Sequence, residues 1–333
     1  MNVPFCNSTA YKIENDDLKE KVYLECERLF SLKLKREYFP GPQPVTIEIK
    51  DIPKLNEGYM VCEKTDGERA ILLLINIDNK PMCFIINRNN DLYFTDLAFK
   101  KEVFEGSIFD GEIIKNKNGI WNYVIHDCFA YNGTSFLNST HNLRYACIID
   151  LIVKRYINKE RDPFNIKTKL FYNYGPNLNV TWDHIQKTTE NKIDGLVFTK
   201  IDHPVIFGRD YLLLKWKEIH TLDLLVKYSN KKINLYYQKR EEIVLYKTVT
   251  RENEKLILEF TTRENLKKGV IIEFKFENYL FVPYRLRTDK NKANSEITIK
   301  NTMINIEEAV TILRLIPECV PDLDLMSLKI SQD

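Results

Sequence analysis

The chain has 333 residues, of which 44% are hydrophobic and 29% are charged, and its formal net charge at pH 7 is +2. This composition predicts a globular protein with two domains, because one hydrophobic core rarely serves so long a chain. The near-neutral charge excludes a general polycation, so any contact with nucleic acid must come from local basic patches. No apolar run reaches the ~20 residues that span a bilayer, and we therefore expect no membrane association.

The cysteines and the N-terminal residues indicate an intracellular, reducing compartment. The seven cysteines are scattered and form no CxxC pair, which disfavours a zinc site and a disulfide framework. The five histidines show no metal-ligand spacing either. The first residues have no basic region followed by an apolar stretch, so they do not indicate a secretory signal.

Helical and strand patterns alternate over the first two thirds of the chain. Helices are expected over residues 16–34, 141–157 and 181–188, and strands over 45–125 and 193–216. Asn15 is a plausible cap for the first helix, and the Pro-Gly-Pro run at 40–42 follows it as a stop. This mixture predicts an α+β domain built around antiparallel sheet.

Beyond Lys217 the pattern changes to short strands with polar turns. They are expected over residues 222–228, 233–237, 243–246, 255–260, 270–276 and 279–285. Short strands without a convincing helix predict a small β-barrel, and the oligonucleotide-binding fold (OB-fold) fits the length. A helix is expected again over 304–315. The tetrapeptide Thr-Arg-Glu-Asn occurs at 250 and at 262, which is too short to indicate a structural repeat.

The most informative stretch is Glu-Lys-Thr-Asp-Gly-Glu-Arg at residues 63–69. Apolar runs at 59–62 and 70–75 flank it, and both runs predict strands, so Lys64 falls at a strand end where it could point into a cleft. A lysine in such a place is usually a surface charge. The alternative is a nucleophile, and the polar groups farther along the chain favour that alternative.

Clusters of polar residues follow at other predicted strand ends. They are Arg88, then Asp110 and Glu112 around a glycine, Asp194 before a glycine, Lys215 and Lys217 around Trp216, and finally Arg287, Asp289 and Lys290. Each cluster alone has a structural explanation, such as the Asp-Gly hairpin turn or a strand with one charged face. Their ordered co-occurrence is better explained by a nucleotide site.

The residue types suit phosphoryl chemistry. A nucleophilic lysine must lose its proton, which neighbouring cations and partial burial favour, and Lys215 and Lys217 are candidates for those cations. The carboxylates Asp110, Glu112 and Asp194 are hard oxygen ligands suited to Mg²⁺ or Mn²⁺. The forked donors of Arg69 and Arg88 suit ribose or phosphate oxygens.

Residues 64–69 match the KxDGxR signature, and here the chain resembles the covalent nucleotidyltransferases, which include mRNA capping guanylyltransferases and ATP-dependent ligases. The later elements occur in the family's order: DGE at 110–112, DGLVF at 194–198, LLKWK at 213–217 and RTDK at 287–290. The forms DGLVF and LLKWK look like capping enzymes more than ligases. The chain most resembles the compact, stand-alone viral RNA guanylyltransferases, from about Pro40 to the terminal helix.

This resemblance implies a two-domain fold. A nucleotidyltransferase domain, with ATP-grasp-like antiparallel sheets and helices, would span residues 1–218 and be completed by a C-terminal helix near 304–328. An OB-fold domain would span residues 219–303. The hinge between the domains would lie near residues 217–222.

The resemblance also implies a reaction. Lys64 would attack the α-phosphate of GTP, form a lysyl-Nζ–GMP intermediate and pass GMP to the 5′-diphosphate end of RNA. The nucleotide-binding set, by this likeness, would comprise Thr65, Arg69, Arg88, Glu112, His126, Asp194, Lys215, Lys217, Arg287, Asp289 and Lys290, with Asp110, Glu112 and Asp194 at a Mg²⁺ or Mn²⁺ ion.

Within that set the expected roles differ. Arg69 and Glu112 would contact ribose, Lys215 and Lys217 would hold the α-phosphate, and Arg287 and Lys290 would reach the β- and γ-phosphates. His126 departs from the family, which usually has Phe or Tyr stacked on guanine at this position. Imidazole stacks less well than those rings, and a histidine that faces solvent or a local partner explains the position equally well.

Two other functions fit some of the residues. An ATP-dependent DNA or RNA ligase uses the same lysine step, and a non-catalytic nucleic-acid-binding protein could keep the fold; nucleotide preference separates the three. A capping enzyme of this kind would rely on a separate RNA triphosphatase and cap methyltransferase. If viral, it would act in the host nucleus or cytoplasm, or in the virion.

Beyond the motifs, Tyr228, Tyr236 and Tyr237 alternate with basic residues. This alternation fits an RNA contact, and a solvated face of the barrel explains it equally well.

Overall fold

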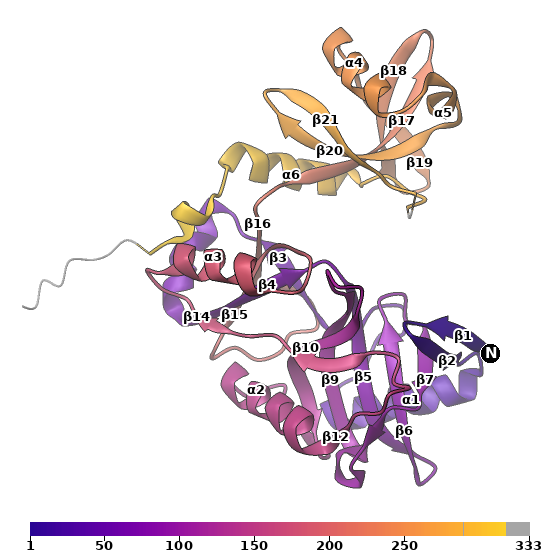
Figure 1. The fold of residues 1–333 in the computed structure, drawn as a ribbon, viewed down its shortest axis with the longest axis vertical. Coiled ribbons are helices and arrows are strands. Elements are labelled where there is room, and N and C mark those ends of the chain that lie inside the picture. Colours follow the sequence, from indigo (N-terminus) through magenta and orange to yellow (C-terminus); the bar gives the residue numbers. More distant parts are fainter. Residues whose placement is uncertain (289, 318–333) are drawn as a thin grey trace, which may run out of the picture. The chain divides into compact units, whose positions relative to one another are not determined.

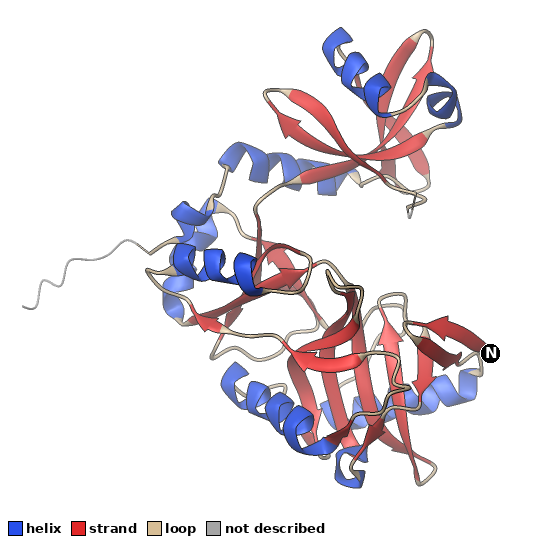
Figure 2. Ribbon diagram, viewed as in Figure 1, coloured by secondary structure: helices blue, strands red, loops and turns tan. Residues whose placement is uncertain are grey.

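The computed structural model describes residues 1–288 and 290–317. Their contacts divide the chain into two compact units (Figure 1). Unit 1 comprises Met1–Ile47, Asp51–Trp216 and residues 312–317, and unit 2 comprises Glu48–Lys50 and Lys217–Thr311. Each unit combines sheets with helices (Figure 2), which confirms the predicted α+β class.

Unit 1 contains a nine-stranded, largely antiparallel sheet. Its strands are β1 (Asn2–Phe5), β2 (Ser8–Lys12), β5 (Glu68–Ile77), β6 (Lys80–Asn87), β7 (Leu92–Thr95), β9 (Glu105–Lys115), β10 (Trp121–Tyr131), β11 (Thr134–Ser135) and β13 (Asn165–Thr168). They run in the order β1-β2-β7-β6-β5-β9-β10-β11, and β13 pairs parallel to β10. Below, this sheet is called the large sheet.

Helices cover both faces of the large sheet, α1 (Asp16–Phe30) on one face and α2 (His141–Asp150) on the other (Figure 1). Ile71 and Leu73 of β5 lie in one apolar cluster with Val22 of α1. The alternating residue Leu72 lies in a second cluster, with Ile148 of α2. A strand that is buried on both faces needs apolar residues at every position, which explains the uninterrupted run at 70–75.

The helix boundaries of unit 1 differ from the prediction by a few residues. The cap is confirmed, since Asn15 Oδ1 accepts a hydrogen bond from the Leu18 amide at 2.7 Å. Helix α1 ends earlier than predicted, at Ser31, whose left-handed backbone (φ 55°) stops the helix. Helix α2 gives way to a π-helical turn (η3, Leu151–Arg155), and the last predicted helical residues form β12 (Tyr156–Ile157), which pairs with β8 (Ala98–Phe99).

A second sheet of five strands, called the small sheet below, completes unit 1. Its strands, in spatial order, are β14 (Tyr172–Asn173), β4 (Tyr59–Thr65), β15 (Ile193–Lys200), β16 (Gly208–Lys217) and β3 (Pro42–Thr46). The remaining helical segments in this part of the chain are α3 (Leu178–Thr188) and the short helices η1 (Ile49–Glu57), η2 (Lys101–Phe104) and η4 (Ile312–Leu315). Trp182 of α3 packs edge-on against Trp216 of β16, with ring centroids 5.4 Å apart.

Unit 2 is built on another five-stranded sheet. Its strands, in spatial order, are β19 (Glu242–Thr248), β18 (Lys232–Lys239), β17 (Thr221–Ser229), β20 (Val270–Glu277) and β21 (Leu280–Leu286), and its helices are α4 (Arg251–Phe260), α5 (Arg263–Lys268) and α6 (Glu296–Glu308). Ile257 of α4 and Leu266 of α5 join Leu224 and Phe274 of the sheet in one core. Helices α4 and α5 thus contradict the expectation of strands without a convincing helix.

The predicted strand over residues 255–260 is wrong, because this segment lies in α4. The repeated tetrapeptide Thr-Arg-Glu-Asn explains the error. Thr250 accepts a hydrogen bond from the Asn253 amide at 3.3 Å, and Thr262 accepts one from the Asn265 amide at 3.3 Å. Both copies are therefore helix N-caps, so the tetrapeptide is a local helix signal although it is no structural repeat.

The C-terminal helix also lies elsewhere than predicted. Helix α6 begins at Glu296, before the predicted start at residue 304, and it belongs to unit 2. After α6 the described chain returns to unit 1 at η4, where the Tyr174 hydroxyl donates a hydrogen bond to the Leu315 carbonyl at 2.6 Å. Residues 318–328 of the expected helix lie outside the described residues.

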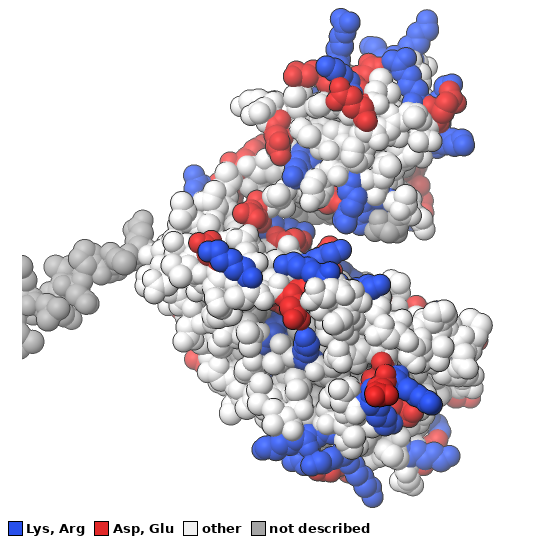
Figure 3. All heavy atoms as spheres, in the orientation of Figure 1, with Lys and Arg blue, Asp and Glu red and all other residues white. Residues whose placement is uncertain are grey.

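Two general expectations concern the surface. On the face drawn in Figure 3, basic and acidic side chains are interspersed on both units, in keeping with the small net charge. Among the residues that the structure describes, no helix is long and apolar enough to cross a membrane.

The chain passes from the small sheet to the large sheet within two residues, 66 and 67, between β4 and β5. Gly67 makes this turn possible because it lies against β9. A Cβ atom at Gly67 would come within 2.8 Å of the Ile113 carbonyl oxygen and of a side-chain carbon of Ile114. A backbone oxygen of a central strand has little room to move away.

We expect Gly67→Ala to lower the free energy of unfolding by about 1–3 kcal/mol, the usual cost of overpacking. Thermal or urea unfolding measures this change. Gly175→Ala is the matched control, because a Cβ atom there meets nothing within 4 Å. Equal stability of the two variants would contradict the close-approach explanation.

Candidate active site

Lys64 lies near the end of β4 and points toward the neighbouring strand of the small sheet. Strand β15 pairs with β4 so that Gly195 is opposite Lys64, and the register shifts between Ile193 and Gly195. This bulge carries Asp194, whose Oδ1 lies 2.6 Å from Lys64 Nζ. Both side chains are partly exposed, at 21% for Lys64 and 34% for Asp194, so the pair lies at the surface of unit 1 and not in its core.

The residue after Lys64 connects the small sheet to the large sheet. The Thr65 hydroxyl donates a hydrogen bond to Glu112 Oε2 on β9. The same oxygen lies 3.2 Å from Lys169 Nζ, which also donates to the Glu63 carbonyl of β4 at 3.2 Å. Lys169 is almost fully buried. Glu112 and Lys169 therefore hold the β4 backbone on both sides of Lys64.

Arg69 makes a second connection between the sheets. Its Nε donates to Asp110 Oδ1 at 2.9 Å and its Nη2 pairs with the other oxygen, while Nη1 donates to the Pro42 carbonyl of β3. The Phe39 ring lies 5.1 Å from the guanidinium carbon. The expected contact of Arg69 with ribose or phosphate is therefore replaced here by a bidentate pair with Asp110.

His126 lies beside the same carboxylate. A register shift in β10 falls between Ile125 and Asp127, at His126, and its Nε2 lies 3.3 Å from Asp110 Oδ2. The other ring nitrogen, Nδ1, is buried and has no hydrogen-bond partner among the described residues. The imidazole thus has a local partner, one of the two explanations expected from the sequence.

Burial and pairing oppose each other at these groups, and pairing prevails. Burial alone would raise the pKa of Asp110, but Arg69 and His126 outweigh it and hold that pKa well below its usual value. Burial would likewise raise the pKa of Glu112, and Lys169, His126 and Thr65 lower it. Burial would lower the pKa of Lys169, and Glu112 raises it. All three groups therefore stay charged near neutral pH.

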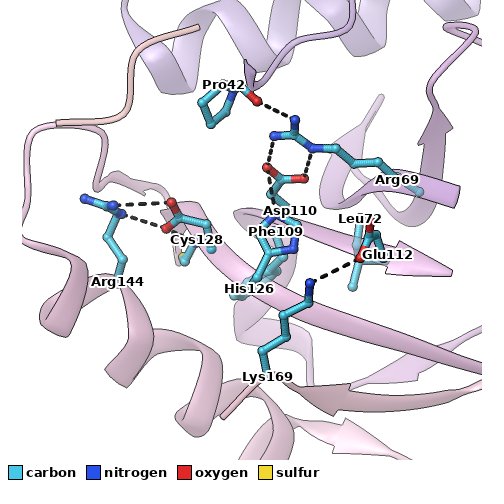
Figure 4. Close-up of polar contacts among 12 residues, drawn as sticks. Pro42, Arg69, Leu72, Phe109, Asp110, Glu112, His126, Cys128, Arg144 and Lys169 are labelled. Carbon is cyan, nitrogen blue, oxygen red and sulfur yellow. Dashed lines mark hydrogen bonds and ion pairs between the residues drawn. The ribbon is translucent and has the colours of Figure 1, made fainter. Parts of the chain in front are cut away.

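Figure 4 shows how these side chains converge between the sheets, with Arg69 and Asp110 on one side of His126 and Glu112 and Lys169 on the other. Farther along β10, Asp127 pairs with the buried Arg144 of α2 at 2.6 Å. The partly exposed amine of Lys64, paired with Asp194, thus lies on a strand next to two ion pairs, Arg69–Asp110 and Lys169–Glu112. Such a site can hold a polar ligand and present one lysine to it.

The other predicted residues of unit 1 are divided between its two sheets. Lys215 and Lys217 alternate with the buried Leu214 and Trp216 on β16, the strand next to β15. Arg88 is exposed in the turn after β6. The residue before it, Asn87, pairs with Ala70, which follows Arg69 on β5. The structure thus places the two lysines beside the strand that carries Asp194 and places Arg88 at the end of a strand of the large sheet.

Unit 2 holds the last predicted group. Arg287 Nη1 contacts both oxygens of Asp223, at 2.9 and 3.1 Å, and Lys290 pairs with the same carboxylate. Glu273 lies 3.5 Å from Arg287. Asp289 lies outside the described residues. Cations that were expected to contact phosphates are thus held by carboxylates of β17 and β20.

The predicted metal ligands are not gathered into one cluster. Within residues 1–288 and 290–317, no group of three or more His, Cys, Asp or Glu side chains is arranged to hold a metal ion. Asp110 is fully buried and engaged by Arg69 and His126, which argues against it as a ligand. Asp194 is more exposed than Asp110. Glu112 accepts hydrogen bonds from Thr65 and Lys169 through one oxygen, Oε2.

Sequence reasoning missed Lys169, Asp223 and Glu273. Lys169 occurs in Ile-Lys-Thr-Lys, and nothing local distinguishes it from Lys167, which is about half exposed and pairs with Glu190 at 3.3 Å. Asp223 is flanked by leucines in a strand, which was a usable signal, since a carboxylate there is buried and needs a partner.

Comparison with known proteins now identifies the family. The family model described as mRNA capping enzyme, catalytic domain, matches residues 9–219. The chain belongs to the mRNA capping enzyme family. This confirms the resemblance inferred from the KxDGxR motif and the elements that follow it.

Several capping proteins are similar to this chain. The mRNA-capping enzyme subunit alpha of Kluyveromyces lactis is 33% identical over 222 residues, which cover 58% of this chain and 47% of that protein. The Yarrowia lipolytica subunit alpha is 27% identical over 318 residues, which cover 82% and 80%. The mRNA-capping enzyme of Mus musculus is 26% identical over 311 residues, which cover 84% and 50%.

The first curated relatives are longer than this chain. The chain spans about half the length of the first curated relatives it matches. These relatives are fungal and vertebrate proteins, so the expected likeness to the viral type stays a prediction. Among solved structures, a mycobacterial DNA ligase D complexed with ATP and MES is similar at a TM-score of 0.44, with 11% identity over 78% of this chain and 97% of that chain. That likeness is too weak to support a conclusion.

We expect the stability of the capping-family chain to fall in acid through Asp110. Its pKa is depressed in the folded state, so its stabilising contribution is present above the unfolded pKa of about 4 and is lost as pH falls below that value. Asp110→Asn should be less stable than the wild type at pH 7 by about 3–5 kcal/mol, because it leaves Arg69 buried and unpaired.

Urea unfolding of both proteins between pH 7 and pH 3 measures the difference. The gap between wild type and Asp110→Asn should narrow toward pH 3, because Asp110 takes up a proton in the unfolded wild type while it stays ionised in the folded protein. Asp16→Asn, at a position where the side chain is 94% exposed, serves as the control with no such gap. A gap that stays constant with pH would contradict the assignment.

Proposed function

We propose that the chain is an mRNA guanylyltransferase, which transfers GMP from GTP to the 5′-diphosphate end of RNA to form a GpppN cap. The observation that carries the proposal is the position of Lys64, a partly exposed amine 2.6 Å from Asp194, in a chain whose family is the capping enzymes. The strand that carries this lysine is held by the half-buried Glu112 and the buried Lys169, which an ordinary surface lysine does not require.

In the first step, Lys64 Nζ would attack the α-phosphorus of GTP. A P–N bond forms, the P–O bond to the β-phosphate breaks, and pyrophosphate leaves with that electron pair. An attacking lysine must be neutral, so its proton has to leave first. Asp194 is the nearest acceptor for that proton, and it would also keep Nζ aimed at the phosphorus.

In the second step, a terminal β-phosphate oxygen of 5′-diphosphate RNA would attack the same phosphorus. The P–N bond then breaks and Lys64 recovers a proton. Lys215 and Lys217 lie on β16, next to the strand that carries Asp194, and would bind the α-phosphate oxygens in both steps. Arg88 and Thr65 remain candidates for nucleotide contacts, and Arg287 and Lys290 for contacts with the β- and γ-phosphates.

We propose Mg²⁺ or Mn²⁺ as the cofactor, with Asp194 and Glu112 as its protein ligands. Mg²⁺ commonly takes only one or two carboxylates and completes its shell with waters and substrate phosphates, so a preformed cluster is not required. When bound, the ion would neutralise charge on the phosphate oxygens. The structural role of Asp110 leaves it outside this set.

Unit 2 would act as an OB-fold domain. Its strand order β19-β18-β17-β20-β21, with helices between the third and fourth strands along the chain, supports this proposal. The fungal relatives are named as alpha subunits, and we propose that this chain too acts with partners, namely a separate RNA triphosphatase and cap methyltransferase.

Covalent labelling tests the proposal. The protein is incubated with Mg²⁺ and α-³²P-labelled GTP or ATP and resolved on a denaturing gel. We expect label from GTP, complete loss of label in Lys64→Ala, and full label in Lys80→Ala, which removes an exposed lysine at the start of β6.

The other outcomes would replace the proposal. Label from ATP in place of GTP would make the chain a polynucleotide ligase. Absence of label from either nucleotide, with Mg²⁺ or Mn²⁺, would favour a non-catalytic nucleic-acid-binding protein. Label that persists in Lys64→Ala would move the nucleophile to another residue.

A further inference from the structure

Tyr284 occupies an unusual position on the edge strand of unit 2. Strand β21 pairs with β20 so that Arg285 is opposite Glu273 and Pro283 is opposite Phe274, and the register shift leaves Tyr284 as the extra residue. Such a β-bulge redirects the side chain of the inserted residue. Figure 1 shows the β20–β21 pair, with β21 at the end of the five-stranded sheet.

The redirected ring is available to a ligand. Tyr284 is 52% exposed, whereas the neighbouring Phe274 and Phe281 are buried in the core of unit 2. The Lys275 ammonium lies 4.3 Å from the Tyr284 ring centroid, within the range of a cation–π contact. An exposed aromatic ring with a cation beside it offers one group for a base and another for a phosphate.

Further positive charge follows directly along the chain. Arg285 Nη2 lies 2.8 Å from Glu273 Oε2, and its side chain is 53% exposed. Glu273 also lies near Arg287, which shares Asp223 with Lys290. Arg285, Arg287 and Lys290 thus face the two carboxylates, and Lys275 lies against the Tyr284 ring. With four cations and two carboxylates, this strip keeps a net positive charge of about two.

The tyrosines singled out by the sequence are less suited to RNA. Tyr237 packs against the core of unit 2, with its ring centroid 6.5 Å from that of Tyr246. Tyr228 also packs against this core, and the guanidinium of Arg263 lies 5.4 Å from its ring. The alternation of tyrosines with lysines therefore reflects the two faces of a strand more than an RNA surface.

We propose that Tyr284, Lys275 and Arg285 form a platform for the single-stranded 5′ region of the RNA acceptor. One base stacks on the Tyr284 ring, and Lys275 and Arg285 contact the flanking phosphates. The charge of the strip matches a polyanion, and an aromatic ring accepts any base, so binding is independent of sequence. The identity of the ligand as RNA rests on the function proposed above.

Fluorescence anisotropy of a 3′-labelled, 5′-diphosphate RNA 10-mer with the full chain, without GTP, tests the platform. We expect Tyr284→Ala to raise Kd about tenfold and Tyr284→Phe to leave Kd unchanged, since stacking needs only the ring. Lys275→Gln should reduce the slope of log K against log salt by about one phosphate contact. Tyr11→Ala is the matched control, because Tyr11 in unit 1 is 49% exposed.

Two further measurements separate the possible failures. Formation of lysyl-GMP from GTP should be equal in Tyr284→Ala and the wild type, because this step needs no RNA, and thermal unfolding should show that both variants are folded. A wild-type Kd in Tyr284→Ala, or a wild-type salt slope in Lys275→Gln, would overturn the platform even where labelling succeeds. If the wild type forms no lysyl-GMP, the proposed function fails, and the Kd comparison still decides whether Tyr284 binds RNA.

Discussion

The position of Lys64 depends on charged groups that are buried between the two sheets of unit 1. Glu112 of the large sheet receives Thr65 and Lys169, and Lys169 also holds the Glu63 carbonyl of the small sheet. A buried ion costs several kcal/mol unless a partner of opposite charge and hydrogen bonds compensate it. No member of this set can move alone without leaving another uncompensated, so the strand on which Lys64 lies is held in one place.

The same principle acts in unit 2 with a different consequence. Asp223 and Glu273 are nearly buried, and they hold Arg287, Lys290 and Arg285 at the sheet. A phosphate that binds these cations must compete with carboxylates that are already in contact with them. Guanidinium has five donors, so Arg287 can keep Asp223 and still donate to a further acceptor. The carboxylates thus orient the cations while they moderate their attraction for phosphate.

Much of the fold followed from short-range patterns. The continuous apolar run at 70–75 predicted a strand, and β5 is buried on both faces. The Asn15 cap was predicted and is present. The apolar residues of segment 255–260 predict a strand when taken alone, but the Thr250 cap that precedes them begins a helix. The end of the chain was misplaced as well, since helix α6 packs in unit 2 and carries a weak amphipathic pattern, with only Ile299 and Asn305 buried.

The sequence by itself indicated the family, the nucleophile candidate and its place at a strand end, because each motif lies within a few neighbouring residues and the order of the motifs can be read along the chain. Only the tertiary structure decided which carboxylate meets which cation. Lys64 and Asp194 are 130 residues apart, Lys169 and Glu112 are 57 apart, and Arg69 and Asp110 are 41 apart. Such pairs form where strand register and bulges bring distant segments together, and a register shift of one residue would turn each side chain to the opposite face of its sheet. The sequence therefore specified the chemical groups, and strand pairing specified their partners.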